Sequence, residues 1–273
     1  MPEASSGRLQ AGTGIALVAI IALLALISLV WTPHGGLAGS GIPLAEADAA
    51  HWLGTDQTGR DVVSALMSAT LMSLLLAWFA TLVSLVIGIP LGTLLAVRLG
   101  EGATRQSMLV GILPAALCLG AIFGGLGVQS TLSVFLAIGL PGAVAATVAS
   151  RAIMAPVLAA DYVAAARLAG LGWLAAGQRH VMPMAMPWLI ALGLELLAAA
   201  ILVEVTLSFA GLGVDGAGLS LGTMLRDGQQ LASVRPLLVV APGMVALVTA
   251  LALLVGAGGL RAGALREVPR GAA

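Results

Sequence analysis

The sequence predicts an all-α membrane protein with several spanning helices. Of its 273 residues, 60% are hydrophobic and only 9% are charged, whereas a soluble domain of this size carries about 25% charged residues. Several runs approach or exceed the roughly 18 apolar residues that mark a spanning helix. These runs are rich in Leu, Ala and Val, and aromatic residues make up only 4% of the chain. Both features argue against a β-barrel, which has short alternating strands and aromatic girdles.

Six apolar runs are the expected spans, and they form one membrane domain over about residues 13–265. A short N-terminal segment, 1–12, precedes this domain, and a tail, 266–273, follows it. The first run is long for a signal peptide and no small-x-small cleavage site follows it, so an uncleaved helix is expected. An amphipathic lead-in around Val62–Thr70 precedes the second run. The expected spans are 13–31, 70–97, 107–127, 130–150, 185–208 and 236–257.

The arginines indicate the orientation of the chain, because basic residues gather in cytoplasmic loops. All 12 basic residues are arginine. With a cytoplasmic N-terminus, nine arginines fall on the inner side and three on the outer side. Both termini and the segment 151–184 are then cytoplasmic. The inner arginines are Arg8, Arg98, Arg105, Arg151, Arg167, Arg179, Arg261, Arg266 and Arg270, and the outer ones are Arg60, Arg226 and Arg235.

The segment 151–184 is a polar insert between two apolar runs, so it is expected outside the lipid. From Pro156 to Leu168 it is rich in Ala, Leu and Arg, which favour a helix. Gly170 and Gly172 are expected to end that helix, and a second short helix is expected over about Trp173–His180. The insert therefore predicts a cytoplasmic helix–turn–helix projection to which a soluble partner binds.

The composition also restricts the chemistry of the chain. It has no lysine and cannot form a Gly-x-x-x-x-Gly-Lys phosphate loop, so any ATP that drives it binds another polypeptide. The lone Cys118 lies in an apolar run and is expected to be a small core residue. A net charge of +0 gives no nucleic-acid footprint. No metal site is expected, because His51 and Asp56 have only His34 as a further histidine nearby and show no ligand spacing.

A segment rich in glycine and charge, His51-Trp-Leu-Gly-Thr-Asp-Gln-Thr-Gly-Arg-Asp61, lies before the second span. Such a composition is typical of a turn-rich cap that pairs its own charges, and direct contact with substrate is the alternative. The candidate residues of this segment are His51, Gly54, Thr55, Asp56, Gly59, Arg60 and Asp61.

Two acids fall in or near the fifth run, where an ionisable residue is costly and therefore indicates a function. Glu195 is nearer the middle of the membrane, and Glu204 is close to the outer boundary, where water is expected to reach it. For each, lining of the translocation path and a structural hydrogen bond are both open. Gly218-Leu-Ser-Leu-Gly222 fits the G-x-S-x-G hydrolase elbow. That motif needs an α/β sheet, so no catalysis is expected.

The insert resembles the coupling loop of ABC-transporter permeases that work with a binding protein. The family pattern is Glu-Ala-Ala, three residues, Gly, and about nine residues to an Ile-x-Leu-Pro-like end. Ala164-Ala165-Ala166, Gly170 and Val181-Met182-Pro183 match it, with Ala164 in place of the glutamate. The resemblance implies contact with ATPase subunits. The coupling candidates are Asp161, Ala164, Ala165, Ala166, Arg167, Gly170, Arg179, His180 and Pro183.

Three further segments carry the same resemblance. His51–Asp61 resembles the His-x-Leu-Gly-Thr-Asp-x-x-Gly-Arg-Asp segment of the second permease of dipeptide, oligopeptide and nickel importers. Glu204-Val-Thr-Leu-Ser-Phe-Ala-Gly-Leu-Gly213 is similar to the family's segment after the fifth span. Gly259-Leu-Arg261 also matches, although the acids that usually flank it are Gly258 and Ala262 here.

The resemblance implies a non-catalytic permease subunit of an ATP-driven importer in the bacterial inner membrane. Its implied partners are a homologous permease, two ATPase subunits that hold ATP and Mg, an extracytoplasmic substrate-binding protein and membrane lipid. The chain itself is expected to hold no cofactor. Peptides are the first expected substrate and nickel is the second. A proton-coupled secondary transporter that uses Glu195 or Glu204 is a more distant alternative.

Overall fold

The long apolar runs form helices, because a helix satisfies every backbone hydrogen bond within its own segment where no water is present. The computed structural model describes residues 2–33, 42–100, 111–127, 130–170, 177, 181–213 and 219–267, and these contain helices but no strand. The helices are α1 (Pro2–Ile27), α2 (Val62–Leu99), α4 (Ile112–Gly125), α5 (Thr131–Leu158), α6 (Asp161–Leu168), α8 (Met182–Phe209), α9 (Leu221–Gln229) and α10 (Leu237–Glu267).

Within the described residues, five helices are long and apolar enough to cross a membrane. They correspond to five of the six predicted spans and lie in α1, α2, α5, α8 and α10. The run predicted at 107–127 forms α4, which has only 14 residues. Such a helix is about 21 Å long, shorter than the roughly 30 Å hydrocarbon core. The chain is therefore an all-helical, multi-pass membrane protein, and α4 is shorter than predicted.

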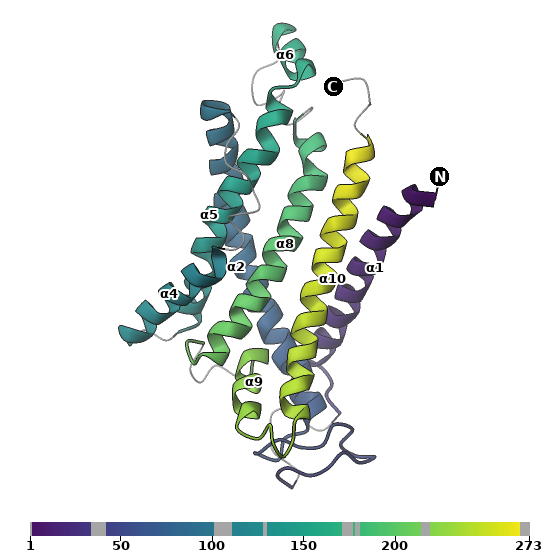
Figure 1. Cartoon of the computed structure of the whole chain (residues 1–273), viewed down its shortest axis with the longest axis vertical. Helices are drawn as coiled ribbons and strands as arrows, with labels where there is room; N and C mark the ends of the chain where they lie inside the picture. The colour runs from purple at the N-terminus through teal and green to yellow at the C-terminus, as the bar shows by residue number, and fades with distance from the viewer. Residues whose placement is uncertain are drawn as a thin grey trace.

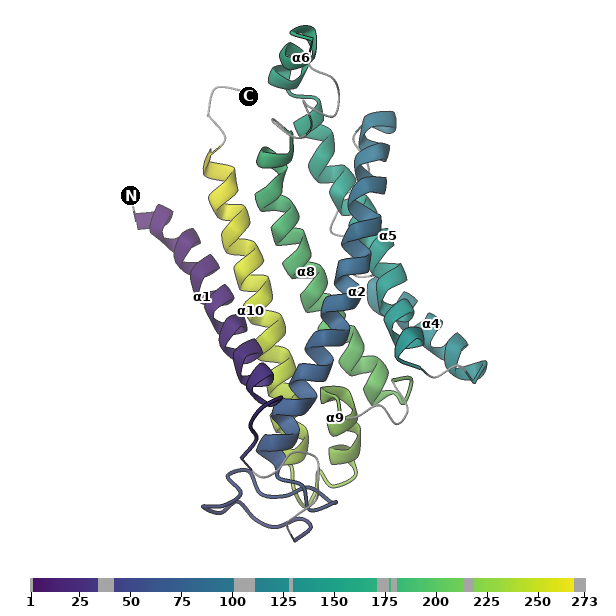
Figure 2. The ribbon, with the colours of Figure 1, turned by 180° about the vertical axis from the view of Figure 1, so that it is seen from behind.

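The long helices run side by side and leave two distinct ends (Figure 1). At one end lie α6, the N-terminal end of α1 and the C-terminal end of α10. At the opposite end lie α9 and the segment that leads into α2, and Figure 2 shows the same division from behind. We call these the α6 end and the α9 end. The structure thus places the insert on the same side as both ends of the chain, as the arginine distribution predicts.

The closest helix pairing, between α2 and α5, depends on small residues. A Cβ on Gly88 would overlap Ala146, and one on Gly92 would overlap Ser150. The Ser150 hydroxyl donates to the Gly88 carbonyl at 2.9 Å, and the Ser84 hydroxyl donates to the Gly139 carbonyl at 3.1 Å. Small residues of this kind let helix backbones approach in lipid, where the hydrophobic effect gives no drive for association.

The second span starts earlier than predicted. Helix α2 begins at Val62 rather than at residue 70, so the lead-in is part of the same continuous helix. Asp61 caps its start, since the Asp61 carboxylate accepts from the Ser64 N–H at 2.9 Å and from the Ser64 hydroxyl at 2.8 Å. A side-chain oxygen at this position satisfies N–H groups that have no partner within the helix.

The predicted helix from Pro156 to Leu168 is wrong in its start. Pro156 lies inside α5, which continues to Leu158, and a short turn then separates α5 from α6. A proline removes one backbone donor, and neighbouring helices let a spanning helix tolerate that loss. Helix α5 ends instead at Leu158, and the N–H of its C-cap, Ala159, donates to the Ala155 carbonyl at 3.1 Å. The second short helix predicted over about 173–180 lies outside the described residues, apart from residue 177.

Candidate functional site

Helix α6 stands at the end of the bundle and presents most of its surface outward (Figure 1). Val163 is 2% exposed and belongs to the main buried cluster, so it anchors the helix to the bundle. Asp161, Ala164 and Ala165 are exposed. Leu168, which sequence reasoning did not single out, is 90% exposed.

Tyr162 adds a partly exposed aromatic ring to the same helix. Burial raises the pKa of the Tyr162 phenol above its ordinary value, and a protonated phenol can both donate and accept a hydrogen bond. Sequence reasoning also missed this residue. The signal that points to it and to Leu168 is the presence of large apolar side chains within a segment otherwise too polar for lipid.

Gly170 ends this projecting segment in a backbone conformation that favours glycine. Its φ is +89°, and a Cβ at this position would meet nothing within 4 Å. The requirement for glycine is therefore conformational rather than steric. The Ala169 N–H still bonds to the Ala165 carbonyl at 3.0 Å, which continues the helical pattern up to the turn. This confirms the prediction of a sharp turn at Gly170.

The other coupling candidates differ in burial, and some of them lie outside the described residues. Ala166 is partly buried, and Pro183 is exposed in the first turn of α8, where a missing backbone donor has no cost. The Arg167 side chain, and the whole of Arg179 and His180, lie outside the part of the chain that the structure describes.

Arg151 connects the helix that carries α6 to the end of α2. Its Nε donates to the Gly100 carbonyl at 3.1 Å, and its Nη2 lies 3.5 Å from the Leu99 carbonyl. A guanidinium at a helix C-terminus satisfies carbonyls that lack a partner and balances the helix dipole. Sequence reasoning used Arg151 only to assign orientation. Its link to a residue 51 positions away has no signature in the sequence.

At the α9 end, the segment 51–61 folds into a cap over the start of α2. The His51 Nδ1 lies 3.0 Å from the Asp61 Oδ1. The buried Thr55 hydroxyl accepts from the Ala45 N–H at 2.8 Å. Gly54 and Gly59 both have positive φ, +75° and +76°, as tight turns require. The cap is therefore built largely by its own hydrogen bonds.

Asp56 forms hydrogen bonds within its own turn and not the predicted charge pair with Arg60. The expected cap pairs the charges of Asp56, Arg60 and Asp61 with one another. Instead, one Asp56 oxygen accepts from the Thr58 N–H and hydroxyl, both at 2.7 Å, and from the Arg60 backbone N–H at 2.9 Å. An aspartate side chain that accepts from the backbone after it is a common way to build a turn, so the Arg60 guanidinium stays available for other contacts.

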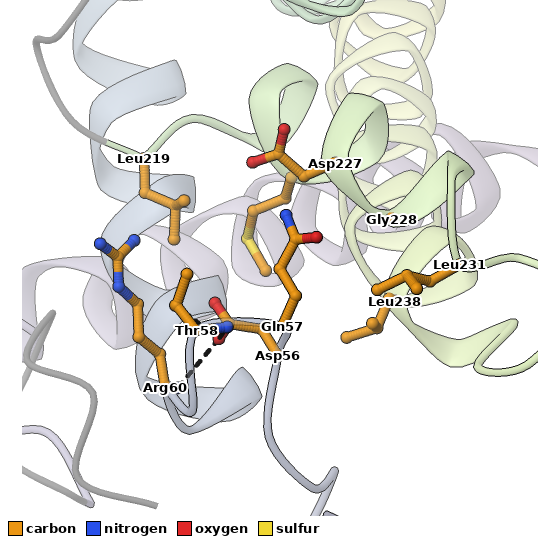
Figure 3. Close-up of a pocket in the computed structure, with 10 residues that line it drawn as sticks. Asp56, Gln57, Thr58, Arg60, Leu219, Asp227, Gly228, Leu231 and Leu238 are labelled. Atoms are coloured by element: carbon orange, nitrogen blue, oxygen red, sulfur yellow. Dashed lines mark hydrogen bonds between the residues drawn. The ribbon is translucent and has the colours of Figure 1, made fainter. Parts of the chain in front are cut away.

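A small cavity of about 50 Å³ lies between this cap and α9. Figure 3 shows Arg60 and Gln57 from the cap facing Asp227 and Leu219 across the opening. The cavity is far smaller than the roughly 300–1,000 Å³ of small-molecule pockets, so it does not have the size of a small-molecule site. It is lined by Asp56, Gln57, Thr58, Arg60, Leu219, Met224, Asp227, Gly228, Leu231 and Leu238.

Arg235, just before α10, fixes the cap from the other side. Its Nη2 donates to the Leu44 carbonyl at 2.7 Å, and its Nη1 lies 3.6 Å from the Glu46 carboxylate. Leu44 has a positive φ of 56°, which is uncommon for a residue with a side chain. The contact therefore holds a strained backbone in place where the segment that precedes the cap meets the start of α10.

The two acids of α8 occupy different environments. Glu195 is buried and forms an ion pair with Arg261 of α10, so the structure gives it a partner on a neighbouring helix. Glu204 is 0% exposed. The expectation that water reaches Glu204 is wrong, because α9 packs against this part of α8. The position of an acid along one helix predicts neither the ion pair between Glu195 and Arg261 nor the burial of Glu204 beneath α9.

The G-x-S-x-G match has a structural explanation. Ser220 is the N-cap of α9, where its hydroxyl accepts from the Thr223 N–H at 3.2 Å and the Thr223 hydroxyl bonds back to the Ser220 N–H at 2.8 Å. The two residues form a reciprocal capping box. The serine therefore starts a helix and is not at a strand-to-helix turn.

The described residues contain no group of three or more His, Cys, Asp or Glu side chains positioned to hold a metal ion. The closest approach of such side chains at the cap is between His51 and Asp61, and the same Asp61 carboxylate also caps α2. This arrangement uses both groups in holding the fold together.

Comparison with known proteins gives a consistent set of relatives, although no family model matches the chain. The nickel transport system permease protein NikC of Escherichia coli K12 is 29% identical over 252 residues, which cover 90% of each chain. The di/tripeptide transport system permease protein DppC of Pseudomonas aeruginosa is 34% identical over 223 residues, covering 80% of this chain and 73% of the relative. A probable peptide ABC transporter permease of Sinorhizobium fredii is 28% identical over 223 residues, covering 80% and 75%.

Proposed function

The chain belongs to the DppC/OppC/NikC-like family of ABC-importer permeases, and on that premise we propose that it forms half of a pathway that carries di- or oligopeptides into bacteria. It is a permease subunit of an ABC importer and a multi-pass membrane protein. Its proposed role is mechanical, with no bond chemistry of its own. ATP and Mg bind the partner subunits.

The observation that carries this proposal is the position of α6. It is a short helix held to the bundle by Val163, with exposed small and apolar side chains. In the chain it follows α5 and precedes α8, and we infer that a force applied to it is passed to these two long helices. We assign the ATPase contact to α6 and its flanking turn at Gly170.

The proposed assembly has five other parts: a homologous permease, two ATPase subunits, an extracytoplasmic substrate-binding protein and the surrounding lipid. The α6 end is assigned to the cytoplasm, because most of the arginines among the described residues lie in the helices and helix ends gathered there. The α9 end, with its cap and small cavity, then faces the binding protein. ATP binding moves α6 and switches the pathway between outward and inward access.

Isolation of the native complex from membranes, with identification of the co-purifying chains, tests the assembly. Two ATPase subunits and a second permease are the expected partners, and a chain that purifies alone would overturn it. Protease added to inside-out vesicles should cut at α6. The same protease added to right-side-out vesicles should spare α6, and the reverse pattern would contradict the orientation.

Nickel is the second candidate substrate, favoured by the relative from Escherichia coli, which matches over 90% of each chain. Peptide is placed first because two of the three relatives described above are named for peptide transport. Growth of a strain lacking this chain on di- and oligopeptides, beside its uptake of radioactive nickel, separates the two. Loss of nickel uptake alone would reverse the order.

A proton-coupled transporter would need an acid free to exchange protons with water. Glu195 is instead paired with Arg261, and Glu204 is fully buried, so this alternative loses support. Purified chain in vesicles with a pH gradient provides the test. We expect no uptake without the ATPase subunits, and uptake by the chain alone would restore the alternative.

A further inference from the structure

An apolar groove lies between α1, α2 and α10, in the half of these helices nearer the α9 end, and its volume is about 410 Å³. Its lining comes from residues between Leu17 and Ala25 of α1, between Leu66 and Thr70 of α2, and between Met244 and Val248 of α10. Both views show α1 beside α10 (Figures 1 and 2). Neither the proposed ATPase contact nor the cap uses this groove.

Helix α1 approaches α10 most closely on the side of the α6 end. A Cβ on Gly14 would lie 2.5 Å from the Ala252 carbonyl oxygen and from the Gly256 nitrogen, so the two backbones nearly touch there. Toward the α9 end, α1 carries large side chains such as Ile20 and Leu24, which stay about half exposed. Only 11% of the α1 span is buried, the smallest share among the spanning helices of the described residues. Helix α1 is therefore the least covered of these helices.

The lining of the groove is apolar. Among the described residues that form it, Thr70 has the only hydroxyl, and this hydroxyl donates to the Leu66 carbonyl at 2.6 Å within α2. The other lining side chains are Leu, Ile, Val, Met or Ala. An occupant therefore meets no free polar group, and an unfilled groove would forfeit dispersion contacts along its walls. Hydrocarbon is the chemistry that matches such a lining.

The groove also lies at the depth of acyl chains. Thr70 lies about 12 Å along α2 from its start, and Val248 lies about 17 Å along α10. One leaflet contributes about 15 Å, half of the hydrocarbon core. Trp31, just past the end of α1, is 59% exposed, and tryptophan gathers at the headgroup level of a membrane. The groove therefore opens to the lipid of a single leaflet.

We propose that this groove binds one acyl chain of a phospholipid in the leaflet at the α9 end. It is continuous with the lipid-facing surface of α1, where Leu17, Ile20 and Leu24 are exposed, so a chain enters from the side. Its volume equals that of about one turn of a helix 10 Å across, which is too little for a spanning helix of another subunit. A seated chain completes the packing of α1 against α2 and α10. The site depends on the membrane location of the chain and not on the transport assignment.

Photolabelling of native membranes tests this site. Cells are grown with a fatty acid that carries a diazirine near the middle of its chain, so that their phospholipids carry the label. After irradiation, the full chain is purified and its labelled residues are located by mass spectrometry. Thr70 reports the floor of the groove, and Thr249 of α10 is the matched control. They are 5% and 1% exposed, and each hydroxyl bonds at 2.6 Å to the carbonyl four residues earlier, but only Thr70 lines the groove.

Labelling of Thr70 should exceed that of Thr249 about tenfold or more, because a closely packed interior leaves no room for a lipid chain. Comparable labelling of the two threonines would overturn the proposal. So would an unlabelled Thr70 beside labelled exposed residues such as Leu24, which would show that another helix covers the groove.

A pair of variants tests the site from the side of α10. Val248→Phe enlarges a side chain that lines the groove and should lower the labelling of Thr70 about fivefold or more, as overfilling of a packed site does. Val255→Phe is the matched control, because Val255 lies about two turns further along the same face, is 45% exposed and does not line the groove. Unchanged labelling in Val248→Phe, or an equal fall in both variants, would overturn the proposal. The comparison of Thr70 with Thr249 needs no variant, so it decides the question if Val248→Phe does not accumulate in membranes.

Discussion

The ion pair between Glu195 and Arg261 predicts how firmly α8 is held to α10. Two nitrogens of Arg261, Nε and Nη2, are buried without a hydrogen-bond partner, so the guanidinium depends strongly on Glu195. Breaking a buried pair by removing one partner costs about 3–5 kcal/mol. The Arg261 side chain keeps 22% exposure, and water therefore screens part of its charge. We expect a loss near the lower limit, about 3 kcal/mol, for Glu195→Ala.

The assay is the free energy of unfolding of the purified full chain in mixed micelles, followed by far-ultraviolet circular dichroism during titration with sodium dodecyl sulfate. The double variant Glu195→Ala/Arg261→Ala should lose little more than either single variant, which gives a coupling energy of about 2 kcal/mol. A coupling below about 0.5 kcal/mol would refute the reasoning. Glu46→Ala is the control, because Glu46 is 86% exposed at 3.6 Å from Arg235 and surface pairs contribute little.

Three further variants test other parts of the structure. Gly170→Val places a β-branched residue at a backbone φ of +89°, a conformation that only glycine adopts readily. This variant should abolish ATP-dependent uptake in reconstituted vesicles and still insert into the membrane. Unchanged uptake would count against α6 as the coupling element. Gly88→Val overlaps Ala146 and should lower the melting temperature in detergent by several degrees, whereas Gly12→Val, which has open space around it, should not. Asp61→Ala removes the N-cap residue of α2 and should lower the free energy of unfolding by about 1 kcal/mol in the same titration. An unchanged free energy of unfolding would show that the N-cap hydrogen bonds of Asp61 are dispensable.

The helices of this chain were predictable because lipid imposes a simple rule on sequence. Every apolar run long enough to span must satisfy its backbone internally, so five of the predicted spans appear as long helices. The boundaries depended on details of single residues. An aspartate before an apolar run, here Asp61, is a typical N-cap that can be recognised in a sequence. It places the start of α2 before the most apolar residues. Pro156 was misleading as the start of a new helix, because a spanning helix continues through a proline where neighbouring groups compensate for the lost bond.

The contacts of the candidate site were much less predictable than the helices. Glu195 and Arg261 lie on different helices, and a sequence gives no register between two helices that pack side by side. The depth of Glu204 was judged from its distance along α8 alone. That estimate missed α9, which packs against the end of α8 and covers the carboxyl group. The turn at Gly170 was predictable because it is local.

Helix α8 is one of the long helices that link the two ends of the molecule. It has 28 residues and begins at Met182, at the end of the insert that carries α6, and it is about 42 Å long. Near its middle Glu195 forms an ion pair with Arg261 of α10, and near its far end α8 packs against α9, where Gly222 lies directly against Ser208. A stiff helix held by its neighbours at these two levels is not expected to move alone. We therefore expect a displacement applied at α6 to move α10 and α9 together with α8, which would connect the proposed ATPase contact to the surface beneath the cap.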